Sequence, residues 1–275
     1  MPAYILGRLK KTKIVILVPD LIYYYTNGIN RVFRSTLLFL ERFVLKRSWD
    51  KIICISGDVQ KKLVQLGVDS EKISIVFCGV SFEEIKKIQK KKNSTFPTIV
   101  CVSRLVSYKR IKDLIKAMQI LKKKYSNIKL IIVGIGEEKE KLEKLVKKYH
   151  LESDVLFHGF VKSHKNVLSL VKNSDIFCST SIVEGFGIAI VEALALGVPC
   201  VLSDISVFRE VTRGKGVLFF KPQDSEDLAK KIRMLLKDKN LYKKLRKEGI
   251  KQAKIFSWKS KILETEKIYE NLCTH

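Results

Sequence analysis

Hydrophobic positions along the chain alternate between short β-branched runs and longer segments of helical periodicity. In the helical segments, such as 111–125 and 227–238, apolar residues recur at i, i+3 and i+4. Strands that alternate with helices favour parallel sheets covered on both faces, so the pattern predicts an α/β protein. The expected strands are 13–18, 51–56, 73–77, 98–103, 129–134, 155–159, 176–180, 199–203 and 216–220.

The expected strands fall into two Rossmann-like units. Residues 83–98 are charged, then polar, and carry Pro97, which is typical of a linker. We expect an incomplete N-terminal unit over 1–90, with three strands. A complete doubly wound parallel sheet follows over 91–255, with about six βα repeats.

Basic residues strongly outnumber acidic ones, with 53 Lys and Arg against 28 Asp and Glu, a formal charge of +25. Such a field attracts phosphates, nucleic acid and anionic lipid headgroups, although solvated lysine-rich helix faces would give the same count. No aromatic–basic platform or reader motif is present, so nucleic acid is not an expected partner. The basic-apolar stretches 9–13 and 39–49 suit an anionic membrane surface.

Cysteine and histidine usage argues against disulfides and metal sites. The six cysteines are scattered without CxxC pairs, mostly in apolar strand-like runs, and the four histidines lack ligand spacing. We therefore expect a reducing cytoplasmic location, no metal and no cofactor. The first 13 residues lack the apolar run of a secretory signal, and the longest apolar run, 14–25, is too short to span a bilayer.

Candidate chemistry begins at strand ends, where open α/β sheets bind ligands. Arg104 and Lys109 surround a short loop after the strand 98–103, where they form a candidate diphosphate clamp; two solvated cations are the alternative. The turn 134–136 has two glycines and lacks the third of a dinucleotide fingerprint, so a turn that needs glycine is the favoured interpretation. At 157–161, Gly159 permits close backbone approach, and His158 is better explained as a core or rim residue than as a ligand.

The segment 184–201 is the most informative stretch of the chain. Glu184 precedes Gly185, Phe186 and Gly187, and a helix is expected over 188–196 with Gly197 as its cap. The glycines let backbone N–H groups face an anion at the helix start, where the dipole adds attraction.

Glu192 lies about one turn into this helix, so its side chain leans back toward the helix start and toward Glu184. Carboxylates accept hydrogen bonds from hydroxyls, so a diphosphate flanked by two polyols fits the set, and that is a nucleotide-sugar. Pairing of Glu192 with a lysine and helix capping by Glu184 are the structural alternatives.

These motifs together resemble the retaining glycosyltransferases of family 4, the glycosyl transferases group 1, which have the GT-B fold. The resemblance rests on the E-x7-E element at 184–192, Arg-Leu-x-x-x-Lys at 104–109, the GxG turn, the strand end 157–161, and the segments 197–204 and 256–272, in family order. It covers residues 50–275 well and 1–50 loosely.

The resemblance implies a role for each matching residue. Arg104 and Lys109 would neutralise the leaving diphosphate, and Glu184 would hold donor-sugar hydroxyls. Glu192 would bind the ribose. The backbone of Phe186, Gly187 and Ile188 would contact phosphate and sugar; that of Gly159, Phe160 and Val161 would line the base. The helix over 256–275 would cross back to the N-terminal unit.

The chain departs from the family pattern at three places. Arg110 replaces the usual glycine after the lysine, and Pro19 precedes Asp20 where the family has His-Asp. The first half of the acceptor-side unit is expected to come from segments before Met1.

We therefore expect transfer of a sugar from a nucleotide-diphospho-sugar to a saccharide or lipid-linked acceptor, at the cytosolic face of a membrane or free of it. The alternative is a truncated or split-subunit protein that binds donor without turnover, completed by a separate polypeptide. A nucleotide-sugar epimerase could share the fold but would not require the paired acids. The sequence does not reveal the sugar, base, acceptor, linkage or oligomeric state.

Overall fold

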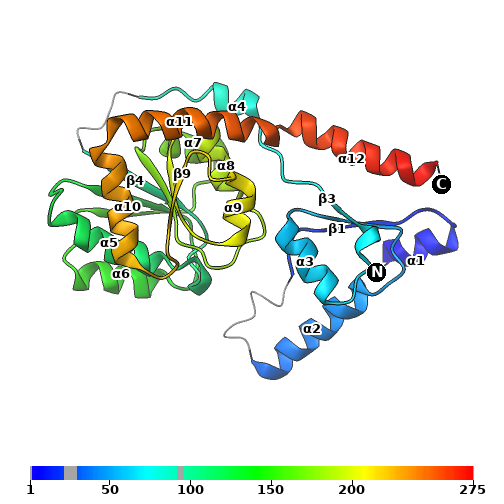
Figure 1. The fold of residues 1–275 in the computed structure, drawn as a ribbon. Helices are drawn as coiled ribbons and strands as arrows, with labels where there is room; N and C mark the ends of the chain where they lie inside the picture. Colours follow the sequence, from blue (N-terminus) through cyan, green and yellow to red (C-terminus); the bar gives the residue numbers. More distant parts are fainter. Residues whose placement is uncertain (1, 22–29, 92–95, 275) are drawn as a thin grey trace. The chain divides into compact units, whose positions relative to one another are not determined.

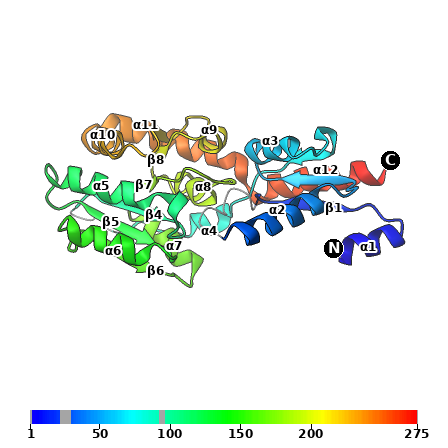
Figure 2. The ribbon, with the colours of Figure 1, turned by 90° about the horizontal axis from the view of Figure 1, so that it is seen from below.

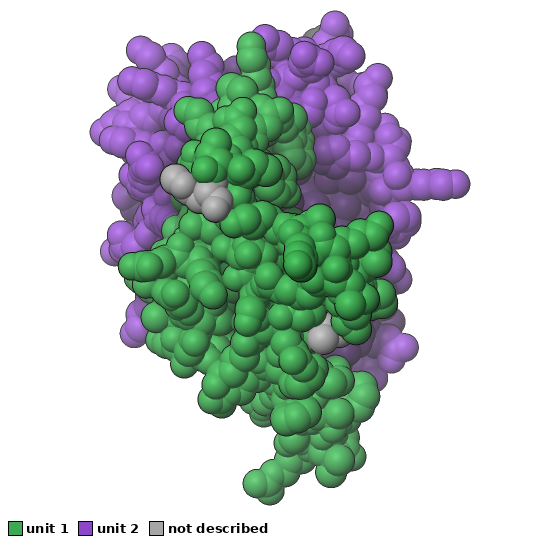
Figure 3. All heavy atoms as spheres, turned by 90° about the vertical axis from the view of Figure 1, so that its right-hand side faces the viewer, with its two compact units in different colours: residues 1–79, 258–275 green, residues 80–257 purple. Residues whose placement is uncertain are grey.

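The computed structural model describes residues 2–21, 30–91 and 96–274. The chain forms two compact units, Met1–Gly79 with Trp258–His275, and Val80–Ser257 (Figure 3). Each is built from parallel strands joined by helices, as the α/β pattern predicts (Figure 1).

The second unit contains a six-stranded parallel sheet in the order β6-β5-β4-β7-β8-β9. The order reverses direction between β4 and β7, which is the doubly wound arrangement expected for this half of the chain. Its strands are β4 (Thr98–Val102), β5 (Lys129–Val133), β6 (Val155–Gly159), β7 (Ile176–Ser179), β8 (Cys200–Ser203) and β9 (Val217–Phe220).

Helices cover both faces of this sheet, because right-handed crossovers on the two sides of the reversal deliver them to opposite faces. One group packs α5 against α6 and α10; the other packs α8 against α4, α7 and α11 (Figure 2). The helices are α4 (Phe82–Lys86), α5 (Ile111–Lys122), α6 (Lys139–Lys148), α7 (His164–Lys172), α8 (Ile188–Ala195), α9 (Ser206–Thr212), α10 (Ser225–Lys237) and α11 (Lys239–Ala253).

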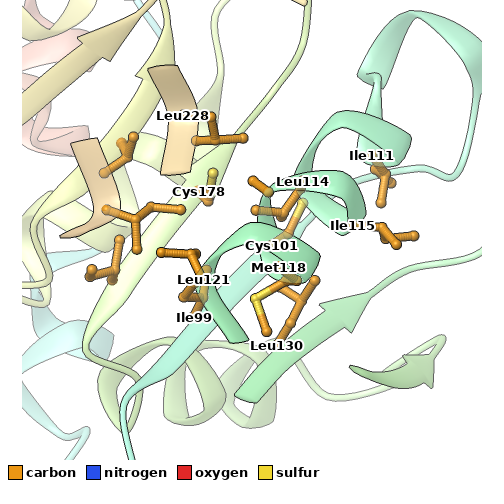
Figure 4. Close-up of a cluster of buried hydrophobic side chains, with 14 of the residues drawn as sticks. Ile99, Cys101, Ile111, Leu114, Ile115, Met118, Leu121, Leu130, Cys178 and Leu228 are labelled. Carbon is orange, nitrogen blue, oxygen red and sulfur yellow. The ribbon is translucent and has the colours of Figure 1, made fainter. Parts of the chain in front are cut away.

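One buried cluster of this unit lies between the sheet and the α5 group (Figure 4). Leu114 and Met118 on α5 contribute to one buried cluster with Ile99 of β4, Cys178 of β7 and Leu228 of α10. Helical spacing on α5 and continuously apolar strands were the sequence features that predicted this packing.

The first unit has a three-stranded parallel sheet of β1 (Val15–Val18), β2 (Lys51–Cys54) and β3 (Ile73–Ile75), in that order. Side chains alternate between its faces. Ile52 and Cys54 join a core with residues of α2 (Arg31–Leu45) and α3 (Gly57–Gln65). Leu17 and Ile53 instead line a cavity of about 510 Å³ beneath α12 (Trp258–Cys273), while α1 (Pro2–Leu9) precedes the sheet.

All nine expected strands are present, each within two residues of its expected bounds. The unit boundary, however, differs from the expected linker at 83–98. Residues 80–90 group with the second unit, since Ile85 and Ile88 are buried and the Lys91 N–H donates to Asn173 Oδ1 at 2.7 Å. At the other end, α12 groups with the first unit.

Truncating the α5 core should destabilise the second unit. Leu114 is fully buried, so Leu114→Ala should lower the free energy of unfolding by about 2–5 kcal/mol, through lost burial and the cavity left behind. Urea unfolding followed by circular dichroism measures the change. Lys116→Ala on the exposed side of the same helix is the control, and an equal effect of both variants would contradict the assigned core.

Candidate functional site

Two loops meet at the carboxyl ends of β4 and β7, where the strand order reverses. The Thr180 hydroxyl donates to the Lys109 carbonyl at 2.7 Å, and the Ile182 N–H donates to the Tyr108 carbonyl at 3.0 Å. These bonds fasten the loop after β7 to the loop after β4. Open α/β sheets bind ligands at such a reversal, and the sequence-predicted cations and acids all lie in this unit.

Lys109 and Glu184 form a buried ion pair between the two loops. The lysine Nζ donates to Glu184 Oε1, and the side chains are 10% and 17% exposed. The Ser181 hydroxyl donates to the same oxygen at 3.2 Å. Because both bonds go to Oε1, the second oxygen, Oε2, can accept a hydrogen bond from a ligand hydroxyl.

Arg104 lies beside this pair, and Tyr108 connects the two cations. Arg104 is exposed, donates from Nη2 to the Tyr108 hydroxyl, and has its Cζ 5.8 Å from the ring centroid. Lys109 Nζ is 5.5 Å from the same centroid. The structure thus brings the two predicted cations together around a ring that sequence reasoning did not select.

The glycine turn after β5 supports the loop after β4. A Cβ on Gly134 would lie 2.0 Å from the Ser103 carbonyl oxygen, and one on Gly136 would lie 2.3 Å from that of Leu105. Only glycine permits this approach of two backbones. The turn therefore has a packing role, in line with the interpretation favoured from the sequence.

Arg110 has a left-handed backbone, with φ +52°. That conformation favours glycine, which is the residue the resembled family has here. The Arg110 guanidinium binds Asp113, with Nε to Oδ2 at 2.8 Å and Nη2 to Oδ1 at 3.2 Å, and Asp113 is 1% exposed. The Arg110 charge is therefore engaged in an ion pair with Asp113 of α5.

The start of α8 has the expected glycine turn. Gly187 precedes the helix with φ +87°, and Gly197 follows it with φ +74°. The Phe186 side chain is buried against Phe256, with ring centroids 5.6 Å apart, which anchors the turn. The Ile190 N–H donates to the Gly187 carbonyl at 2.9 Å, and the N–H groups of Ile188 and Ala189 before it lie at the positive end of the helix dipole.

Glu192 pairs with a histidine rather than a lysine. Its Oε1 is 2.9 Å from Nε2 of His164, and Nδ1 of His164 is 3.6 Å from Oε2 of Glu84. Burial raises the pKa of Glu192, and the adjacent His164 opposes that rise. Sequence reasoning missed His164; its position three residues after the strand end 157–161 was the only available signal.

The segment after β6 offers an exposed aromatic surface. Phe160 is 73% exposed, and Gly159 has φ +73° with open space around its Cβ position. Val161 follows, three residues before His164. The role of Gly159, Phe160 and Val161 in lining a base stays a prediction. His158 is an exposed residue of β6.

The described residues were compared with the requirements of a metal site and of a membrane-spanning helix. Within residues 2–21, 30–91 and 96–274, His, Cys, Asp and Glu side chains form no group of three that could hold a metal ion. None of the helices in these ranges combines the length and apolar composition needed to cross a bilayer.

The fold and site define an α/β protein whose doubly wound unit carries paired cations and acids at the strand-order reversal. The family model of the glycosyl transferases group 1 matches residues 81–252. The chain belongs to this family.

Two proteins of similar sequence are glycosyltransferases by description. An uncharacterised glycosyltransferase of Methanocaldococcus jannaschii is 30% identical over 245 residues, 85% of this chain and 61% of that protein. The gpi3 subunit of a Schizosaccharomyces pombe phosphatidylinositol N-acetylglucosaminyltransferase is 26% identical over 226 residues, 81% of this chain and 49% of that protein. The chain thus spans about half to three fifths of these relatives.

A solved structure confirms the GT-B fold. Anabaena HepE in complex with UDP-glucose aligns with a TM-score of 0.82 at 21% identity, covering 98% of this chain and 75% of HepE. This likeness bears on the fold alone.

The Arg110–Asp113 pair should show strong energetic coupling. Arg110→Gly relieves the left-handed backbone but leaves Asp113 buried without its cation, so we expect a loss of about 2–4 kcal/mol of unfolding free energy. Asp113→Ala should restore most of the loss when added to Arg110→Gly. A double-mutant cycle in urea measures the coupling, expected at about 1–3 kcal/mol. Strict additivity would show that the pair does not compensate for the strained backbone.

Glu192 should make stability depend on pH. Since its folded pKa is raised, its contribution is fully present below its unfolded pKa and is lost as pH rises through the folded value. Glu192→Gln removes this loss, so the variant should gain on the wild type over the pH range that begins at the unfolded pKa of glutamate, about 4.3, and rises through the folded value, by about 1.4 kcal/mol per pKa unit of rise.

Thermal unfolding across that pH range tests this expectation. Glu140→Gln, at an exposed position of α6, is the control and should give a constant difference from the wild type. A Glu192→Gln difference that is flat with pH would contradict the raised pKa.

Proposed function

We propose that this chain binds a nucleotide-diphospho-sugar and transfers its sugar to a saccharide or lipid-linked acceptor with retention of anomeric configuration. The observation that carries the proposal is the buried Lys109–Glu184 pair at the strand-order reversal, with Arg104 beside it. It places cations and a hydroxyl acceptor next to each other, which is what a diphospho-sugar requires. HepE, of the same fold, was crystallised with UDP-glucose.

In this proposal the donor lies across the start of α8. Arg104, Lys109 and the first N–H groups of the helix neutralise the diphosphate as its bond to the anomeric carbon breaks, so electrostatic stabilisation needs no metal. The acceptor hydroxyl oxygen forms its bond to that carbon on the face that the diphosphate leaves, and its proton passes to the departing diphosphate oxygen. Glu184 holds donor-sugar hydroxyls from its free Oε2, while Glu192, oriented by His164, accepts from the ribose.

The first unit has an edge strand at which further strands could pair. β1 pairs only with β2 among the described strands, and Leu17 on β1 is 61% exposed. The alternative form of the proposal is that a separate polypeptide adds strands at this edge and completes the acceptor pocket, in which case this chain alone binds donor without turnover. We further propose a cytoplasmic location, which the free cysteines of the described residues, four of them buried, support.

Donor binding should be detectable on the chain as it stands. A thermal-shift panel of UDP-, GDP- and ADP-sugars should stabilise it with at least one donor. Arg104→Ala and Glu184→Gln should each weaken that binding by about tenfold or more, since each removes a charged contact. Lys239→Ala, at an exposed position of α11, should bind as the wild type does.

The outcomes separate the alternatives. No shift with any donor would contradict the proposed function. A shift without sugar release to saccharide or lipid-linked acceptors, restored by a polypeptide that supplies the remaining strands, would support the split-subunit form. Transfer by the chain alone would contradict that form and leave the transferase proposal standing.

A further inference from the structure

Helix α2 of the first unit is apolar on two faces. One face packs into the core through Val44 and Leu45. The other is an exposed apolar stripe, which we call the α2 stripe; it consists of Val32, Phe33, Phe39, Leu40 and Phe43, which are 76%, 58%, 67%, 51% and 43% exposed.

The α2 stripe follows helical geometry. Val32, Phe39 and Phe43 are spaced by seven and four residues, so they lie in one row at 3.6 residues per turn, and Phe33 and Leu40 border that row. Scattered single hydrophobic residues are normal on a protein surface, but five exposed apolar side chains on one side of a helix, with Ser35 and Thr36 as the polar positions between Val32 and Phe39, indicate a contact surface.

Cations border the α2 stripe on one side. Arg31, Arg42 and Lys46 are spaced by eleven and four residues and form a parallel basic row along the helix. An amphipathic helix with phenylalanine and leucine on one face and a basic border is typical of helices that lie in the headgroup region of a membrane.

The basic row ends in a shallow pocket of about 330 Å³ at the C-terminal end of α2, which we call the α2 pocket. It is lined by Phe39, Arg42, Phe43, Lys46 and Arg47. None of these lining residues is acidic, so three cations converge on a small volume walled by two aromatic rings. The arrangement suits a phosphate held next to an apolar layer.

Arg47 supplies the most specific feature of the α2 pocket. Its guanidinium lies over the Phe43 ring, with Cζ 3.8 Å from the centroid. Its Nε is buried and has no hydrogen-bond partner in the part of the chain that the structure describes. One N–H donor of this guanidinium is therefore without an acceptor among the described residues, and the group lies against the Phe43 ring.

We propose that α2 docks the chain on an anionic phospholipid surface, with the α2 stripe in the headgroup–acyl boundary and a lipid phosphate in the α2 pocket. The charge complementarity of the basic row to anionic lipid favours this occupant over a protein of unspecified charge. The proposal deepens the proposed function, because it would place a lipid-linked acceptor beside the enzyme. It does not depend on donor binding.

Vesicle flotation of the full chain tests the proposal. Recovery with phosphatidylcholine–phosphatidylglycerol vesicles should exceed recovery with phosphatidylcholine alone. Arg42→Ala/Lys46→Ala should weaken binding to the anionic vesicles about 30-fold, because each cation near such a surface contributes about one factor of five. Phe39→Ser should weaken it about tenfold through lost burial.

Matched controls separate a specific site from the overall charge of +25. Lys237→Ala/Lys239→Ala removes the same number of exposed lysine or arginine charges from a shallow pocket at the α10–α11 junction, where Asp238 lies between them. Met234→Ser, 41% exposed in the same pocket, is the apolar control. Both controls should retain binding within about threefold of the wild type.

Three results would overturn the proposal. The first is equal recovery with neutral and anionic vesicles. The second is an equal loss of vesicle binding in Arg42→Ala/Lys46→Ala and in Lys237→Ala/Lys239→Ala, which would indicate that binding depends on overall charge. The third is light scattering that shows a dimer which Phe39→Ser converts to a monomer, which would assign the α2 stripe to a second copy.

Two further measurements guard against misfolding and against confusion with the proposed function. Val32→Ser/Phe33→Ser alters the α2 stripe away from the α2 pocket and should weaken vesicle binding even if Phe39→Ser unfolds the first unit. The donor-induced thermal shift should persist in all the α2 variants. Loss of vesicle binding with a retained donor shift, or the reverse, therefore tells the two proposals apart.

Discussion

The ion pair between Lys109 and Glu184 is the constraint on which the site depends. Two opposite charges, 10% and 17% exposed, lie at the ends of β4 and β7, so removal of one partner leaves the other largely desolvated and without its counter-charge. The pair gives little net stability by this reasoning, but it fixes which loop faces which. The bonds from Thr180 to the Lys109 carbonyl and from Ile182 to the Tyr108 carbonyl then define the backbone around it.

The need to hold Lys109 next to Glu184 also explains the residues of the loop after β4 and of the turn that supports it. The loop after β4 can pass close to β5 only because Gly134 and Gly136 lack side chains. Its end requires a left-handed residue, and Arg110 is tolerated there through its bidentate contact with Asp113. The two glycines and the left-handed Arg110 allow this loop to place Lys109 next to Glu184, which follows the neighbouring strand β7.

The strand positions and the proximity of Lys109 to Glu184 could be predicted from the sequence, for a physical reason. Buried parallel strands must be continuously apolar, and their carboxyl ends must share one edge of the sheet, so Arg104, Lys109 and Glu184 could be placed together without coordinates. Contacts such as His164 with Glu192 could not be predicted, because they join helices whose relative rotation depends on packing of the whole unit. Tyr108 was missed for the same reason, as an ordinary loop residue whose ring is oriented by its neighbours.

The linker assignment at 83–98 shows where composition misleads. Lysines and polar residues dominate that segment, yet burial of Ile85 and Ile88 and the Lys91–Asn173 hydrogen bond bring its first part into the second unit. The charge of +25 requires the same caution. Only 28 acids are available for 53 cations, so an excess on the surface is inevitable and does not by itself identify a partner. The informative feature is local: at the end of α2, cations converge beside exposed aromatic rings without an acid among the lining residues, whereas Asp238 separates the lysines at the α10–α11 junction. A surface that concentrates both charge and apolar area needs an occupant that is anionic and apolar at once, and a phospholipid layer has both properties.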